Sequence, residues 1–271
     1  MTRRIFLHHH IFKNAGSTID WILERNFQKD FTSIEIDNSS WRITESMIFN
    51  LLHQKQNLIA VSSHHLNGQI FEYEAYVFFD IVFIRHPIDR LRSIYDYYRK
   101  LPHPTNEVES ASHNFGLGDF LKFLLEFHPH QINDAQVNIL ANQGKYYRPP
   151  GESDLELARS KILKMALLGS LEMFDESLVV GRYFLHPAWN KLDLTYKPQN
   201  VAANKKSNLQ DRLSEIKALC GEQVYDQLLR MNQLDLRLLE AVNLEVQRRA
   251  KLVPDFNQKL DDFKTNCLAL I

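Results

Sequence analysis

The sequence predicts an α/β fold in which a P-loop-like central parallel sheet is flanked by helices and followed by a helical C-terminal region. Short apolar runs alternate with segments of helical periodicity up to residue 185, which is typical of strand–helix units with parallel strands. From about residue 209 the pattern is helical alone. With 271 residues and neither an internal repeat nor an interdomain linker, we expect a single domain, 1–271, whose helical extension covers about 209–271.

Four apolar runs are the expected strands of the sheet. The longest is YVFFDIVFI at residues 76–84, whose β-branched and aromatic residues are too continuous for a half-exposed strand. The other three expected strands are residues 4–8, 58–62 and 166–169.

Helical periodicity follows most of these runs. Apolar residues recur at helical spacing from Ile19 to Phe27, and Ser17 or Thr18 suits the N-cap of this helix. Pro87 suits the first position of a helix after the third strand. We also expect helices at 119–127, 132–141, 154–165 and 174–185, and a long helical region at about 209–252.

Composition restricts the class of protein. The 32 Lys and Arg nearly balance the 33 Asp and Glu, so any anion site must be local, and no nucleic-acid partner is indicated. Cys220 and Cys267 fit no zinc or disulfide pattern, which favours a reducing compartment. No apolar run approaches the ~20 residues of a membrane span, and the N-terminus lacks a signal-peptide layout. We therefore expect a cytoplasmic protein; the alternative is a luminal domain without its anchor.

A small-residue segment joins the first predicted strand to the first predicted helix. Ligands of parallel sheets bind at such junctions, where a helix N-terminus offers unpaired N–H groups and a positive dipole to an anion. A glycine lets the backbone approach the ligand, and a lysine before it supplies charge. The order is not the Walker pattern, in which the lysine follows the glycines. The alternative is an ordinary connection with a surface lysine. The residues are Lys13, Asn14, Ala15, Gly16, Ser17 and Thr18.

The end of the third predicted strand repeats this arrangement. Arg85 lies at the strand tip, where its guanidinium could hold a phosphate through two parallel hydrogen bonds. Ser93, eight residues later, lies about two turns into the next helix and could reach the same phosphate. The alternative is a salt bridge between Arg85 and Asp89, with Ser93 facing solvent.

Together, the two motifs resemble the nucleotide-binding signatures of sulfotransferases that use 3′-phosphoadenosine 5′-phosphosulfate (PAPS). The first resembles the 5′-phosphosulfate loop, and the second resembles the 3′-phosphate motif, an Arg-x-Pro opening with a serine eight residues after the arginine. The closest resemblance is to the carbohydrate branch, Golgi-type enzymes like heparan sulfate 2-O-sulfotransferase, and its bacterial relatives, whose first motif reads HIPKTAGT. Phe12 here replaces that proline, and His86 stands where many members carry aspartate.

The resemblance extends from residue 4 to about residue 208. Residues 133–143 and 168–178 are similar to later family blocks, the second to G-x-x-E-x-F-D-E-S-L. The resemblance implies that Lys13 to Thr18 hold the 5′-phosphosulfate and that Arg85 and Ser93 hold the 3′-phosphate. Lys205, in a late basic loop, is a further candidate contact to PAPS. The C-terminal helices are left unassigned.

Sulfuryl transfer to an alcohol needs a group that accepts the hydroxyl proton. A histidine suits this role because its ordinary pKa lies near neutrality. His64 follows the second predicted strand, at the sheet edge shared with both anion motifs, and resembles the histidine of the family segment G-H-x-P-x-G. His65, Glu72 and Glu74 are alternatives. Lys13 is expected to donate to the leaving oxygen as charge develops there.

These expectations describe a PAPS-dependent sulfotransferase that transfers in line to a hydroxyl acceptor, a saccharide by the branch resembled, without a metal. The adjacent residues His8, His9 and His10 alternate sides in a strand, so they cannot all face one ion. One alternative is a nucleotide-dependent kinase, although the sequence lacks its Walker lysine and metal-holding aspartate. Another is a non-catalytic module of the same fold that binds a nucleotide or a partner.

Overall fold

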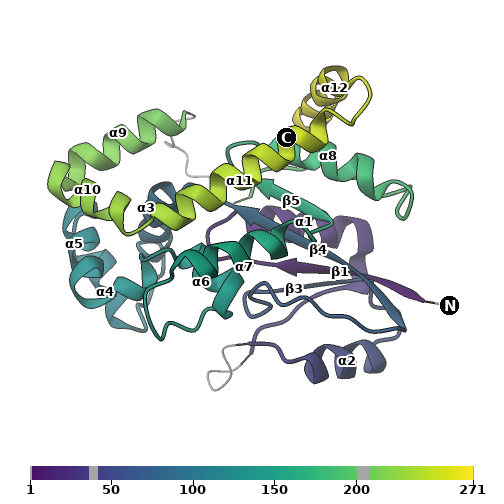
Figure 1. Cartoon of the computed structure of the whole chain (residues 1–271), viewed down its shortest axis with the longest axis horizontal. Helices are drawn as coiled ribbons and strands as arrows, with labels where there is room; N and C mark the ends of the chain where they lie inside the picture. The colour runs from purple at the N-terminus through teal and green to yellow at the C-terminus, as the bar shows by residue number, and fades with distance from the viewer. Residues whose placement is uncertain (1, 37–41, 200–207, 271) are drawn as a thin grey trace.

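A five-stranded, all-parallel sheet forms the centre of the molecule (Figure 1). The computed structural model describes residues 2–36, 42–199 and 208–270. The strand order β2-β3-β1-β4-β5 places the first strand in the middle, so the carboxyl ends of β1, β3, β4 and β5 share one edge. This confirms the predicted α/β class. The strands are β1 (Arg3–His9), β2 (Phe31–Ser33), β3 (Ala60–Ser63), β4 (Tyr76–Ile84) and β5 (Leu167–Ser170).

Strand alternation directs apolar side chains to both faces of the sheet. Phe6 and Phe83 pack on one face against helices α1 (Gly16–Phe27), α8 (Phe174–Leu185) and α12 (Phe256–Leu268). Ile5 faces the other side, against α2 (Glu45–Gln54), and Val82 packs there against α6 (Ala135–Asn142), α7 (Glu152–Ile162) and α11 (Gln233–Ala250). Both faces are therefore covered, as expected of a parallel sheet.

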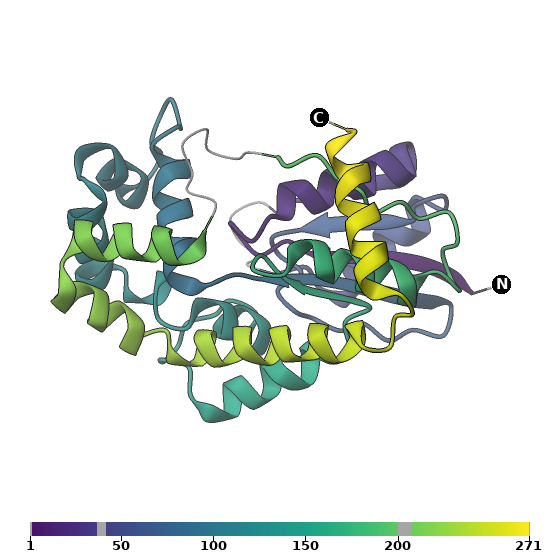
Figure 2. The same ribbon diagram turned by 90° about the horizontal axis from the view of Figure 1, so that it is seen from above.

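A separate helical layer lies beside the carboxyl edge of the sheet. Its apolar core joins α3 (Pro87–Tyr98), α4 (Glu107–Asn114) and α5 (Leu117–Phe127) with α9 (Leu209–Cys220) and α10 (Glu222–Arg230). From this layer α11 runs back along the sheet to α12 (Figure 2). The region predicted as one long helical stretch is thus divided, with one break at Gly221, whose φ of +83° suits glycine. No helix in these described ranges is long and apolar enough to cross a membrane.

Helices α6 and α11 cap each other's N-termini. The carboxylate of Asp134 accepts hydrogen bonds from the N–H groups of Leu234 and Asp235, at 2.8 and 2.9 Å. In return, the carboxylate of Asp235 accepts from the N–H groups of Gln136 and Val137, at 3.0 and 2.7 Å. Each aspartate thus satisfies two of the free N–H groups at the start of the other helix.

The start of α1 differs from the prediction. The N-cap is Ala15, which has φ 62° and makes no side-chain capping bond, and the helix begins at Gly16. Because the helix begins earlier than expected, neither Ser17 nor Thr18 is the N-cap; both hydroxyl residues lie in its first turn and line the adjacent cavity.

Candidate active site

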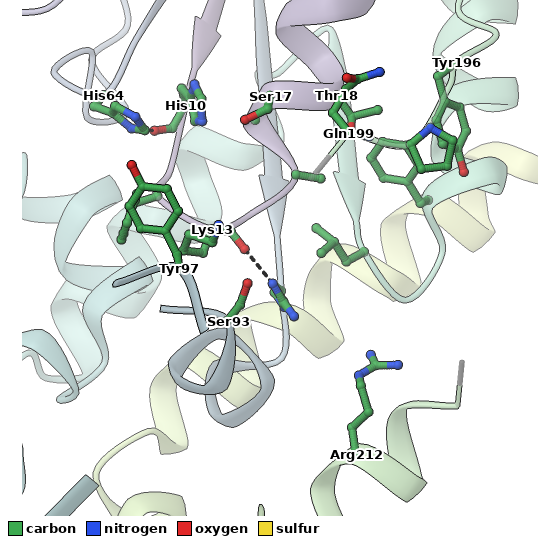
Figure 3. Close-up of a pocket in the computed structure, with 17 residues that line it drawn as sticks. His10, Lys13, Ser17, Thr18, His64, Ser93, Tyr97, Tyr196, Gln199 and Arg212 are labelled. Carbon is green, nitrogen blue, oxygen red and sulfur yellow. Dashed lines mark hydrogen bonds between the residues drawn. The ribbon is translucent and has the colours of Figure 1, made fainter. Parts of the chain in front are cut away.

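A cavity of about 570 Å³ opens at the carboxyl edge of the sheet, between β1, β3, β4 and the helical layer. It collects most of the residues that the sequence nominated, from segments far apart in the chain (Figure 3). The predicted residues that line it are Lys13, Ala15, Gly16, Ser17, Thr18, His64, Arg85 and Ser93.

The loop before α1 presents backbone N–H groups to this cavity. Lys13 and Ala15 both have positive φ, 66° and 62°, so the loop doubles back on itself before the helix begins. Within the described chain, the N–H groups of Ala15, Gly16 and Ser17 have no hydrogen-bond acceptor. Free donors at a helix N-terminus suit a phosphate or sulfate oxygen.

Gly16 is required by its neighbour His10. A Cβ at this position would lie 1.8 Å from Cδ2 and 1.9 Å from Nε2 of His10. The glycine therefore allows the imidazole to lie directly against the loop.

Lys13 points along the cavity wall formed by α3. Its Nζ lies 4.5 Å from the ring centroid of Tyr97, a cation–π contact. Burial, together with the charges of Arg85 and Lys100, lowers the pKa of Lys13 to about 8. The ammonium is thus short of compensating negative charge, which a bound anion would supply.

Arg85 is held by a buried network on the other side of the loop. Its Nε and Nη2 donate to the Asp89 carboxylate at 2.9 and 2.7 Å, and its Nη1 donates to the Lys13 carbonyl at 2.9 Å. The dashed line in Figure 3 marks this last bond. The salt bridge considered as the alternative is present, but the guanidinium also faces the loop and lines the cavity. Arg212 of α9 joins the network by donating to Asp89 from Nε at 2.7 Å.

The tautomer of His64 is fixed by a backbone carbonyl. Its Nδ1 lies 2.6 Å from the His10 carbonyl oxygen, which can only accept, so Nδ1 carries the proton. Nε2 is then left with a free lone pair in the neutral ring. Burial, together with the neighbouring His10, lowers the pKa of His64 below its usual value. A neutral imidazole with an unprotonated Nε2 can accept a proton.

One carboxylate orders two of the three adjacent histidines. Asp20 of α1 accepts from Nδ1 of His8 at 2.7 Å and from Nδ1 of His10 at 2.9 Å. Although burial works in the opposite direction, the charge and hydrogen bonds of the two histidines hold the pKa of Asp20 well below its usual range. These three side chains also form a group that could hold a metal ion. His9 lies on the other face of the strand and is bound to Asp80.

Several nominated residues do not line the cavity. The Asn14 side chain is buried and donates to the Phe83 carbonyl and to Gln136, so only its backbone is near a ligand. His65 contacts Glu35 at 3.2 Å instead. The alternatives Glu72 and Glu74 precede β4 and lie at the opposite edge of the sheet, in a separate hollow. Lys205 lies outside the described residues.

Other cavity residues were not nominated from the sequence. Figure 3 shows Arg212 entering from the side opposite His64, with Gln199 beside Thr18. Tyr196 is a further lining residue. Tyr196 packs edge-on against Phe174 at 4.9 Å, within the resembled block 168–178. The similarity of that block to the family could have identified Phe174 as a cavity residue. No sequence feature pointed to Arg212, because it lies beyond the segment that resembles the family.

Glu172, in the same block, supports the second anion motif. Its Oε1 accepts from the backbone N–H of His86 at 2.8 Å. This contact joins the segment after β5 to His86, the residue between Arg85 and α3, and so helps to fix the position of the Arg85 backbone.

Comparison with known proteins agrees with this geometry. The chain matches the sulfotransferase family over residues 2–240. It is also similar to an uncharacterized protein of Archaeoglobus fulgidus, with 26% identity over 247 residues that cover 89% of this chain and 97% of the relative. The family match spans both anion motifs, His64 and Arg212. The chain belongs to the sulfotransferase family and is a PAPS-dependent sulfotransferase.

Proposed function

We propose that this enzyme transfers the sulfuryl group of PAPS to a hydroxyl of a saccharide, with His64 as the base. The observation that carries the proposal is the meeting of two cationic anion sites and one tautomerically fixed histidine in a single cavity. The saccharide acceptor follows from the resemblance to the carbohydrate branch, and fold-level likeness alone does not determine an acceptor.

The lining of the cavity fits a nucleotide with an anionic group at each end. The N–H groups of residues 15–17 and Lys13 would hold the 5′-phosphosulfate. Arg85 and Ser93, with Arg212 beside them, would hold the 3′-phosphate. Tyr196 and Phe174 offer apolar surface for the rest of the nucleotide. At the first site, the N–H groups of residues 15–17 have no acceptor in the described chain. At the second, the two guanidinium groups are already held by Asp89.

His64 is suited to take the acceptor proton. As the acceptor oxygen bonds to sulfur, its proton passes to Nε2 of His64, while Nδ1 remains bound to the His10 carbonyl. The bond between sulfur and the 5′-phosphate oxygen breaks in the same displacement, which leaves the sulfated acceptor and adenosine 3′,5′-bisphosphate. The contact of His10 with Asp20 keeps the neighbouring ring in place.

Lys13 is suited to stabilise the leaving oxygen. Its ammonium precedes the loop that would hold the 5′-phosphosulfate, and a donor aimed at developing charge lowers a barrier by about 3–4 kcal/mol. Positive charge from Lys13, Arg85 and Arg212 can serve the role that a metal ion plays in phosphoryl transfer, so we propose transfer without a metal.

The proposal is tested with His64→Ala and the matched control His65→Ala. With labelled PAPS and a panel of hydroxylated saccharides, we expect the first variant to lose at least about 100-fold in kcat and the second to retain activity. Both should keep wild-type affinity for adenosine 3′,5′-bisphosphate, which a thermal-shift titration measures. Unchanged turnover in His64→Ala would rule this histidine out as the base.

A further inference from the structure

A second, smaller cavity of about 240 Å³ lies behind Phe12, the residue that precedes Lys13. Phe12 lines both cavities, so the two share part of a wall. The other walls of the smaller cavity are formed by two apolar side chains of α3, Ile94 and Tyr98, and by polar side chains around α6. The proposed sulfuryl transfer does not use this cavity.

The cavity contains a buried arginine that forms no ion pair with the residues that the structure describes. Arg90 is only 7% exposed, and its Nε donates to the Phe12 carbonyl at 2.9 Å. Its Nη1 and Nη2 have no hydrogen-bond partner and no carboxylate contact among the described residues. Neither nitrogen is among the sealed, unsatisfied polar atoms of the described chain, so both open into the cavity, where an anion can accept from them.

The carboxylate that acts on Arg90 already accepts hydrogen bonds from other groups. Asp235 is buried and acts on Arg90 at a distance, but its oxygens accept from the backbone of α6 and the Gln136 amide. It therefore offsets part of the charge and leaves the guanidinium's hydrogen-bonding face open.

A second buried donor faces the same cavity. Asn138 is 4% exposed; its Oδ1 accepts from Asn142, while its Nδ2 has no acceptor in the described chain. His130 and Gln131 line the mouth, and no carboxylate does so among the described residues. At about 30 Å³ for each water molecule, the volume suits a small oxyanion with several waters.

We propose that Arg90 and Asn138 form a binding site for one small oxyanion group, a carboxylate or sulfate, separate from the nucleotide cavity. The group belongs either to the acceptor or to a free small anion. Because Arg90 also holds the Phe12 carbonyl, an anion bound here lies against the loop that carries Lys13.

The test measures anion binding and does not depend on sulfotransferase activity. Protein saturated with adenosine 3′,5′-bisphosphate, which fills the first cavity, is titrated with sulfate and with acetate by calorimetry at constant ionic strength. We expect saturable binding to wild type and at least about tenfold weaker binding to Asn138→Asp and Arg90→Met, because a charge-assisted bond is lost. Arg99→Met, which removes a charge near the end of the same helix outside both cavities, should bind as wild type does.

Asn138→Asp keeps the proposal falsifiable if Arg90→Met does not fold. The new carboxylate can pair with Arg90 and occupy the site itself, so this variant should melt at or above the wild-type temperature. Absence of saturable binding to wild type, or equal binding to wild type and Asn138→Asp, overturns the proposal.

A second arm identifies the source of the anion. Saccharide acceptors are compared with the same saccharides after reduction of their carboxyl groups. A rise in KM for the acidic acceptors alone in Asn138→Asp assigns the anion to the acceptor. Equal kinetics, with free-anion binding lost, assigns the site to a free anion. If no acceptor is sulfated at all, the proposed function fails, while calorimetry still decides the site.

Discussion

Substitution of Gly16 by alanine tests how closely the loop before α1 depends on His10. The added Cβ would lie 1.8 Å from the imidazole, so the ring must withdraw by about 1.6 Å to reach ordinary contact at 3.4 Å. The ring cannot withdraw freely, because Asp20 holds Nδ1 at 2.9 Å and His64 packs at 4.0 Å between ring centroids.

The expected loss of stability follows from these contacts. Overpacking costs about 1–3 kcal/mol, and breaking the hydrogen bond to the Asp20 carboxylate adds about 1.5–3 kcal/mol. Alanine regains about 1 kcal/mol because Gly16 begins a helix with an ordinary φ. We expect a net loss of about 3 kcal/mol, together with weakened binding of adenosine 3′,5′-bisphosphate.

The assay is urea unfolding of a double-mutant cycle. In the His10→Ala background the ring is absent, so Gly16→Ala should be neutral or slightly stabilising, with a coupling of about 3 kcal/mol between the two sites. Gly116→Ala is the control, since a Cβ there meets nothing within 4 Å. An equal cost of Gly16→Ala in both backgrounds would refute the argument.

Three further changes have defined outcomes. Asp89→Asn leaves Arg85 and Arg212 without their shared carboxylate and should cost about 3–5 kcal/mol in a urea melt, with an enlarged stabilisation by bisphosphate; wild-type stability would contradict it. The kcat/KM of free enzyme should fall above about pH 8 as Lys13 loses its proton, and Lys13→Arg should move this limit upward; an unmoved limit assigns it to another group. Burial and the Asp235 carboxylate raise the pKa of Asp134 from 3.8 to about 7, so the native state binds the proton more tightly than the unfolded chain and stability should decline as pH rises from 3.8 through about 7. Unfolding at several pH values should show a smaller decline in Asp134→Asn, and an unchanged slope would count against this carboxyl.

Buried apolar runs made most of the sheet predictable. Residues 76–84 match β4 at both ends because the continuous run has no competing periodicity. β2 and α2 were missed since β2 has three residues and no buried side chain, and α2 buries only two. Elements that depend on tertiary contacts leave little trace in a local pattern.

The candidate site was predictable where it follows a strand. Arg85 and His64 come directly after β4 and β3, and Lys13 follows the end of β1 by four residues, so the topology of one parallel sheet brings them together. The inward turn of Asn14 was not predictable, because it depends on the positive φ values on either side. From the local sequence, Arg212 is indistinguishable from an ordinary surface charge on a helix. Only the packing of α9 against α3 brings it to Asp89.

Two polar contacts join residues far apart in the sequence, and this separation has a consequence for synthesis on the ribosome. Asp89 emerges 123 residues ahead of Arg212, and Asp134 emerges 101 residues ahead of the N–H of Asp235. At 5–20 residues per second, the first pair stays incomplete for about 6–25 s. A nascent chain that stalls before α9 would therefore contain every signature motif, yet Asp89 and Arg85 would lack the contact with Arg212.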